Sequence, residues 1–296
     1  MLQDRIFKPV ADTLVYHYCS GQTLQAILSS KTIRLSDVNM MNDFNEGAYG
    51  YGLFEEAASE IMGDDKIRSV FPDLDRSFFE KVDEIISPIQ FAIHPVIACF
   101  SKKPDVLSQW SRYADEARGF CVGFDAQMMS DLPVTIVEVE YDRATQIKEV
   151  REALCGLYMY NREEKLNFGK PFFRECGIFA TMLFSFKSES FREEQEVRIL
   201  HLLNVVADDD RPRLKDAGGV SAKRNVKGQP VKYRVSGAGE IIAYVDLPFP
   251  VKKDRSMVRE IWYGPRNDNR PGNLLYMASE YGHKNYKMHK SKITLR

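Results

Sequence analysis

The chain has 296 residues, with 41 Lys or Arg against 42 Asp or Glu, so its formal net charge is -1. Its 44% hydrophobic residues are enough for a sizeable core, and the composition excludes general disorder. No apolar run approaches the roughly 18 residues of a membrane-spanning helix, and the first residues lack the apolar segment of a secretory signal. We therefore expect a soluble cytoplasmic protein with no membrane partner.

The cysteines and histidines give no sign of a metal site. The five cysteines are odd in number and widely spaced, without a CxxC pair, which argues against a disulfide framework and a sulfur-ligated zinc ion. The five histidines have no ligand spacing. The chain also lacks a P-loop, a GxGxxG after a strand, HExxH and GxSxG, so the familiar nucleotide and hydrolase motifs are absent.

Hydrophobic periodicity predicts alternating strands and helices in the first half of the chain. Strands are expected at 14–18, 32–36, 96–101, 119–125 and 135–141. Helices are expected around 24–28 and at 46–62, 74–90 and 107–117.

The second half contains two segments that we interpret as insertions. Residues 145–187 are rich in helix pattern, which predicts a helical insertion at about 143–187. The segment 211–234 is basic and glycine-containing, which is typical of a loop or ribbon. Strands at 194–200, 240–245, 258–263 and 292–295 and a helix at 273–281 complete a single α+β domain, 1–296, with a mixed sheet.

The first strand carries His17 between Tyr16 and Tyr18. Strand alternation places His17 on the opposite face from both tyrosines, so one set faces the core and the other a cleft. A lone histidine in an apolar strand is more often a core residue than a site residue, and both interpretations stay open.

Three further polar features stand beside apolar elements. The stretch 42–46, beginning at Asn42, fits either a helix cap with an acidic first turn or the lining of a pocket. Ser101 ends a buried strand. Trp110 and Tyr113 follow on a helix, where they either pack in the core or form a platform for a flat ligand.

The segment Glu194-Gln195-Glu196-Val197-Arg198 is the clearest candidate for a chemical site. On a strand, Glu194, Glu196 and Arg198 share one face. Paired carboxylates stabilise an oxocarbenium ion when a glycosidic bond breaks. The alternative is an exposed salt-bridge ladder on an edge strand.

Basic residues gather late in the chain. The segment 211–234 has one acid, Asp216, against eight cations: Arg211, Arg213, Lys215, Lys223, Arg224, Lys227, Lys232 and Arg234. The tail 283–292 is also basic and offers Tyr286 for stacking. These segments fit nucleic-acid phosphates, an acidic partner or an ordinary solvated surface.

Several segments together resemble a large bacterial family of unknown function. They are YHY, NDFNEG, ACFSKKPDVLSQWSRYADEARGFCVGFD, FREEQEVRIL and IWYGP. Members of that family typically read YHYTS, NDPFE, WSHYA and ENEYR at corresponding places. The resemblance covers most of the chain but implies no chemistry.

The order of the same residues also resembles the ADP-ribosyltransferase fold of the His-Tyr-Glu kind, which implies a split sheet and NAD as co-substrate. The resemblance implies that His17 holds the adenosine-side ribose, that Tyr113 stacks on nicotinamide and that Glu196 hydrogen-bonds the nicotinamide ribose. Glu194 is similar to the first glutamate of an E-x-E pair, which approaches the acceptor. Further cofactor contacts are then expected from Tyr18, Asn42, Ser101 and Trp110.

This chain departs from that pattern in two places. Tyr18 and Cys19 follow the histidine where many such enzymes have Gly-Ser or Gly-Thr, and a long helical insertion separates Tyr113 from Glu196. Ser101 is also similar to the serine of the Arg-Ser-Glu class, although position 17 is not arginine.

The resemblance implies an NAD-dependent mono-ADP-ribosyltransferase whose His17, Tyr113 and Glu196 converge on one cleft. The expected acceptor is nucleic acid, RNA first, with protein second, in a bacterial toxin–antitoxin or anti-phage setting with an antitoxin partner. Acceptor contacts are expected from Arg198, Lys223, Arg224 and Lys227. The alternatives are a non-catalytic module that binds nucleic acid or a partner, and a metal-independent nuclease.

Overall fold

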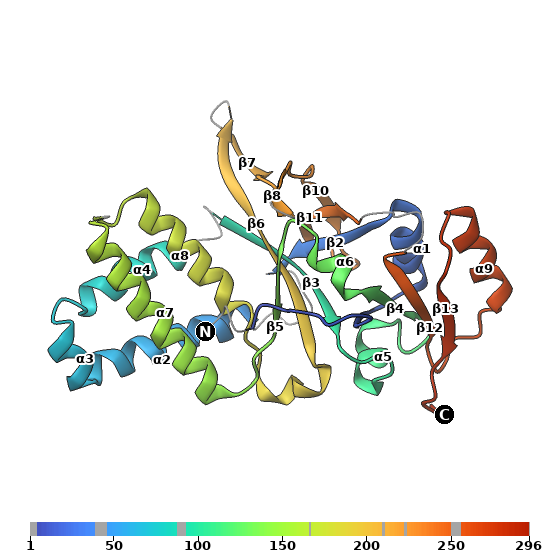
Figure 1. Ribbon diagram of the computed structural model, residues 1–296, viewed down its shortest axis with the longest axis horizontal. Helices are drawn as coiled ribbons and strands as arrows, with labels where there is room; N and C mark the ends of the chain where they lie inside the picture. Colours follow the sequence, from blue (N-terminus) through green and yellow to red (C-terminus); the bar gives the residue numbers. More distant parts are fainter. Residues whose placement is uncertain are drawn as a thin grey trace.

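A large mixed β-sheet with helices on both faces forms the centre of the molecule (Figure 1). The computed structural model describes residues 5–38, 46–87, 93–165, 167–208, 211–221, 224–249 and 256–295. Within these ranges, 11 strands belong to the main sheet and β8 and β9 form a separate two-stranded one. The expected α+β class and mixed sheet are therefore confirmed.

The strands are distributed along the whole chain. They are β1 (Leu14–Cys19), β2 (Thr32–Asp37), β3 (Ile93–Ser101), β4 (Phe120–Asp125), β5 (Thr135–Glu138), β6 (Glu196–Asp208), β7 (Arg211–Asp216), β8 (Gly219–Ser221), β9 (Arg224–Val226), β10 (Lys232–Val235), β11 (Ile241–Pro248), β12 (Val258–Tyr263) and β13 (Lys287–Lys290).

The helices fall mainly in two blocks before and after the central strands. They are α1 (Gly21–Ser30), α2 (Glu46–Gly63), α3 (Asp65–Val70), α4 (Arg76–Ile86), α5 (Leu107–Tyr113), α6 (Ala126–Ser130), α7 (Arg143–Glu163), α8 (Lys170–Leu183), the 3₁₀ helix η4 (Glu189–Glu194) and α9 (Pro271–Glu280). No helix in the described ranges is long and apolar enough to cross a membrane.

The main sheet divides around β3. Its path runs β10-β11-β2-β3-β1-β4-β12-β13, and β6 pairs with β3, β5 and β7. β3 meets β2 at Ile97 and Val96 and meets β1 only at Ser101, so β1 and β2 diverge from it. β12–β13 is parallel, whereas the other main-sheet pairings are antiparallel.

The two faces of the sheet differ in chemistry. The core face carries Val15, Val122 and Val197, which belong to the main hydrophobic cluster together with residues of α1 and α9. The opposite face, here called the cluster face, carries Tyr16, Ser101 and Glu196 (see below). The alternation of apolar and polar residues along the strands produces this difference.

The helical layer has a hydrophobic core of its own. Buried residues of α2, α4, α7 and α8 form one cluster, which includes Leu53, Phe78, Leu154 and Phe179. In Figure 1 these helices stand together on the left of the sheet. The segment 143–187 therefore supplies only half of this layer, because helices at 46–63 and 76–86 bury their apolar faces against it.

Several expected element boundaries are wrong, among them the end of the strand expected at 135–141, which stops at Glu138. The helix expected to reach residue 117 ends at Tyr113, because residues 115–117 adopt left-handed backbone conformations with φ of 49–70°. The strand expected from residue 194 begins at Glu196, after Gln195 with φ 44°. The last strand lies at Lys287–Lys290 rather than 292–295.

Candidate functional site

Strand register brings three separated residues to the cluster face. Glu196, the first residue of β6, lies directly opposite Ser101 on β3, and Ser101 lies opposite Tyr16 on β1. Side chains that oppose each other in an antiparallel pair point to the same face. The register therefore fixes Tyr16, Ser101 and Glu196 on one face.

Glu196 is a buried carboxylate of this face (5% exposed). Arg198 donates to it through Nε (2.6 Å) and Nη2 (2.9 Å), and Lys187 Nζ lies 3.3 Å from its Oε2. Burial alone would raise the pKa of Glu196, but the charges of Arg198 and Lys187 outweigh burial and lower that pKa to about 2. Glu196 is therefore ionised at any physiological pH.

Glu194, which is also buried (2% exposed), forms the other end of the same group. Lys187 Nζ donates to its Oε2 at 2.7 Å, and the Tyr113 hydroxyl donates to its Oε1 at 3.2 Å. Arg112, whose side chain is 52% exposed, lies 3.6 Å from the same Oε1. Ser101 Oγ donates to the backbone carbonyl of Glu194 at 2.8 Å.

These residues form what we call the Glu194–Glu196 cluster, which consists of Ser101, Arg112, Tyr113, Lys187, Glu194, Glu196 and Arg198. Lys187 joins the two carboxylates. Tyr113 is half-buried and Arg112 is exposed, so the Glu194 end of the cluster contains its most exposed members. Burial is the main cause that raises the pKa of Tyr113, so its hydroxyl remains a donor.

The position of Tyr113 depends on the loop that follows it. Residues 115–117 turn the chain back, and the Gly119 N–H donates to the Ala114 carbonyl at 2.7 Å. A Cβ at Gly119 would lie 2.2 Å from the Cys19 carbonyl oxygen, so only glycine fits there. The loop therefore anchors the end of α5 to β1.

Trp110 of α5 packs against Tyr18 of β1 and so fixes the position of the helix on the sheet. Their rings meet edge to face at 4.9 Å, and both residues are buried. The Tyr18 hydroxyl bonds Lys103 O and Val106 N, and Trp110 Nε1 donates to Asp105. Because their polar atoms all bond to the protein, both residues support the cluster and are not positioned to contact a cofactor in this conformation.

His17 lies on the core face, away from the cluster. It opposes Val122 in the sheet, and its ring lies 5.6 Å from that of Phe100. Because a carbonyl can only accept, His17 Nδ1 donates to the Cys99 carbonyl at 3.0 Å. Burial lowers the pKa of His17. The expectation that His17, Tyr113 and Glu196 converge on one cleft is therefore wrong, because one strand cannot direct His17 and Tyr16 to the same face.

Arg198 is also placed differently from the expectation. It is fully buried, pairs with Glu196 and donates through Nη1 to the Phe184 carbonyl at 2.8 Å. A direct contact with a macromolecular substrate is therefore excluded in this conformation. Asn42 and Lys223 lie outside the described residues, so their expected roles have no structural description here.

The basic insertion was expected to be a loop or a ribbon, and its described residues form β-strands, as a ribbon does. We define the basic arm as residues 211–221 and 224–228, which contain β7, β8 and β9; Arg224 and Lys227 are exposed on it. Asp216 turns inward, accepts from the Gly218 and Gln229 N–H groups and pairs with His201 at 2.8 Å. However, Asp208, Asp209 and Asp210 directly precede Arg211 in the sequence and offset its charge.

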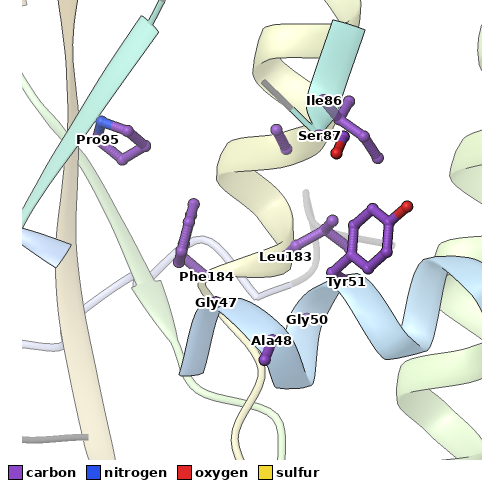
Figure 2. Close-up of a pocket in the computed structure, with 10 residues that line it drawn as sticks. Gly47, Ala48, Gly50, Tyr51, Ile86, Ser87, Pro95, Leu183 and Phe184 are labelled. Carbon is purple, nitrogen blue, oxygen red and sulfur yellow. The ribbon is translucent and has the colours of Figure 1, made fainter. Parts of the chain in front are cut away.

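Two cavities lie elsewhere in the described residues. One, of about 270 Å³, lies between α2, α8 and β3 and is lined by Tyr51, Pro95, Leu183 and Phe184 among others (Figure 2). The other, of about 490 Å³, lies between α8, β6 and residues 217–220. Neither lining includes a residue of the Glu194–Glu196 cluster. The described residues also contain no group of three or more His, Cys, Asp or Glu placed to hold a metal ion.

Two residues of this neighbourhood, Lys187 and Tyr141, were not predicted from the sequence. Lys187 bridges the carboxylates, and Tyr141 accepts the Glu196 backbone N–H at its hydroxyl (2.9 Å). A signal for Lys187 existed, because it directly follows the apolar stretch 178–186 and a buried lysine requires an acidic partner. Nothing in the sequence marked Tyr141.

Residues 109–199 match the DUF2971 family, a family of proteins of unknown function. No curated protein and no solved structure matches the chain. The matching segment begins one residue before Trp110 and ends one residue after Arg198. It therefore contains every member of the Glu194–Glu196 cluster except Ser101, and it excludes the basic arm.

Proposed function

We propose that this protein is an NAD-dependent ADP-ribosyltransferase whose reactive centre is the Glu194 end of the Glu194–Glu196 cluster. The observation that carries the proposal is the pair of buried carboxylates joined by Lys187, of which Glu194 accepts a hydrogen bond from the Tyr113 hydroxyl. The divergence of β1 and β2 from β3 supports an ADP-ribosyltransferase-like split sheet.

The energetics of buried charge favour a function for this cluster. Replacing a buried ion network with well-packed apolar residues is often neutral or stabilising, so such a network is weak evidence for a stabilising role. Clusters of charged groups with shifted pKa values are common at functional sites, although structural networks also produce them. Its place within the family-matched segment supports the functional interpretation.

The geometry favours Glu194 rather than Glu196 as the carboxylate that acts on NAD. Both oxygens of Glu196 are held by Arg198, and Lys187 approaches one of them. Glu194 Oε1 instead faces Tyr113 and the exposed Arg112. We therefore assign Glu196 a positioning role, which differs from the role that the resemblance implied.

In this proposal the bond between ribose C1′ and the nicotinamide nitrogen breaks, and nicotinamide leaves with the bonding electrons. Glu194 stabilises the positive charge that develops on the ribose, an effect worth about 3–4 kcal/mol for a well-placed group. The Tyr113 ring covers the nicotinamide, and Arg112 binds the diphosphate. The acceptor then bonds to C1′ and releases its proton to solvent. His17 has no part in this proposal.

The experiment is to incubate the full chain with NAD labelled on the adenylate phosphate, together with RNA, DNA and protein, and to follow the label. Arg112→Gln should raise the KM for NAD by about tenfold or more, because a charge-assisted phosphate contact is lost. Arg118→Gln is the matched control, because Arg118 is an equally exposed arginine (51%) that pairs with Glu116. The proposal is contradicted if none of the acceptors takes up label and no nicotinamide is released.

A second candidate function is nucleic-acid binding by the basic arm, either as the acceptor site or without catalysis. The observation that favours it is the inward position of Asp216, which leaves the cations Lys215, Arg224 and Lys227 on the surface of the arm. Nuclease activity without NAD would instead favour the remaining alternative.

Salt dependence tests the second candidate. Neutralising Arg224 and Lys227 together should reduce the slope of log affinity against log salt by about 1.4–1.8, at about 0.7–0.9 per phosphate contact. Neutralising Arg76 and Lys81, exposed cations on α4, is the matched control and should leave the slope unchanged. An unchanged slope in the Arg224 and Lys227 variant contradicts nucleic-acid binding by the arm.

A further inference from the structure

Among the described residues, the outer edge of β10 is exposed and unpaired. We propose that this edge binds an extended acidic segment of a partner protein by β-strand addition, in which the segment becomes a further strand of the main sheet. β10 is the terminal strand of the sheet path, and within the described ranges no strand pairs with its outer side. All four of its residues, Lys232–Val235, are exposed.

The hydrogen-bond pattern shows which backbone groups are offered. The hairpin closes with Ser236 N–H donating to the Glu240 carbonyl at 2.8 Å. Hydrogen-bonded and non-hydrogen-bonded positions alternate along an antiparallel pair, so Lys232 and Arg234 bond to β11. Tyr233 and Val235 therefore direct their N–H and C=O groups outward, as an incoming strand requires.

The side chains on one side of this edge are apolar and unusually exposed. Tyr233 is 59% exposed, Val235 69% and Ile241, which opposes Val235, 68%. An added strand would place its own apolar residues beside Tyr233 and Val235 and extend the apolar surface that Ile241 begins on β11. This side therefore selects apolar residues at every second position of the partner.

The other side of the edge is positively charged. Lys232 and Arg234 share it with Tyr244, over which the Arg34 guanidinium lies at 3.9 Å from the ring centroid. Asp246 already accepts from Arg34 and Lys232. Arg234 has no ion-pair partner among the described residues, so this side selects acids at the alternate positions.

The same charges exclude a second copy of the chain as the occupant. Two β10 strands paired edge to edge would place Lys232 and Arg234 of both copies on one side of the new ribbon, and opposed like charges destabilise a strand pair. The cations therefore prevent self-association while they attract an acidic strand. No residue of this site belongs to the Glu194–Glu196 cluster, so the two sites are independent.

Peptide binding to the full chain tests the proposal. The probe is a short blocked peptide in which valine and glutamate alternate, and its control is the same peptide with lysine in place of glutamate. Fluorescence anisotropy should show the glutamate peptide binding at least about tenfold more tightly. Arg234→Glu should reverse that preference, because it exchanges the charge that selects the partner.

Val235→Pro separates strand addition from simple charge attraction. Position 235 does not donate to β11, so proline removes only the outward N–H and the melting temperature should stay within a few degrees. Loss of glutamate-peptide binding in this variant is the expected result. Three results would overturn the proposal: equal binding of both peptides, unchanged binding by Val235→Pro, or concentration-dependent dimerisation of the unmodified chain.

Discussion

His17 and Glu196 point to opposite faces of the same sheet. His17 opposes Val122 on the core face, whereas Glu196 opposes Ser101 on the cluster face. A ligand bound at one of these residues therefore has the sheet between it and the other. Any chemistry at the Glu194–Glu196 cluster proceeds without the histidine.

Glu196→Gln should strongly destabilise the fold. The substitution leaves Arg198, which is fully buried, without its bidentate carboxylate, and breaking a buried ion pair costs about 3–5 kcal/mol. Chemical denaturation measures the loss. Glu138→Gln on the neighbouring strand is the control, because the half-exposed Glu138–Lys102 pair (2.7 Å) is worth about 0–1 kcal/mol. Equal effects of the two substitutions would contradict the buried network.

Acid should remove the contribution of Glu196. Its pKa is about 2 in the folded protein against about 4.5 ordinarily, so the contribution is complete above pH 4.5 and is lost as pH falls towards 2. The difference in free energy of unfolding between the unmodified chain and Glu196→Gln should therefore shrink by about 2 kcal/mol between pH 7 and pH 3. A difference that does not change with pH would show that the carboxylate is not held by the two cations.

His17 should stay neutral as the solution is acidified past its ordinary pKa of 6.5. Burial lowers the pKa of His17, and the hydrogen bond to the Cys99 carbonyl offsets this only in part. Because the unfolded chain takes up the proton first, His17 reduces stability as pH falls below 6.5. NMR titration of ring-labelled histidine checks this, and a His17 midpoint at or above 6.5 would contradict it.

Asp216→Ala should loosen the basic arm without unfolding the protein. Its carboxylate accepts from two backbone N–H groups and from His201, so its loss leaves those donors unpaired. Amide hydrogen exchange of Gly218 and Gln229 should accelerate by about tenfold or more. Asp73→Ala, at an exposed loop carboxylate, should leave these rates unchanged. Unchanged rates in Asp216→Ala would mean that other contacts hold the arm.

Strand positions were predictable because period-2 alternation is local. The strands around His17, Cys99 and Cys121 lie where the pattern predicted them. Which face of a strand meets which partner depends on register between distant segments, and the sequence carries no record of it. Ser101, Tyr113, Glu194 and Glu196 were identified as candidates by residue type. The face of His17 depended on register, and the resemblance placed it on the wrong one.

Other features depended on backbone conformations that the sequence did not mark. The left-handed Gln195 separates Glu194 from β6, so the two glutamates meet through Lys187 and not through strand alternation. Similarly, the charge of segment 211–234 was visible, but only the fold shows that its single acid, Asp216, is used internally.

The most direct test of the central claim is nicotinamide release from NAD by the unmodified chain and by Glu194→Gln, measured per folded molecule at neutral pH. Glu194→Gln should fold, because Lys187 keeps its contact with Glu196 and the amide oxygen still accepts from Tyr113. The proposal predicts release by the unmodified chain and a loss of about 10²–10³-fold in the variant. Equal release by both proteins, or none by the unmodified chain with any acceptor, would contradict it.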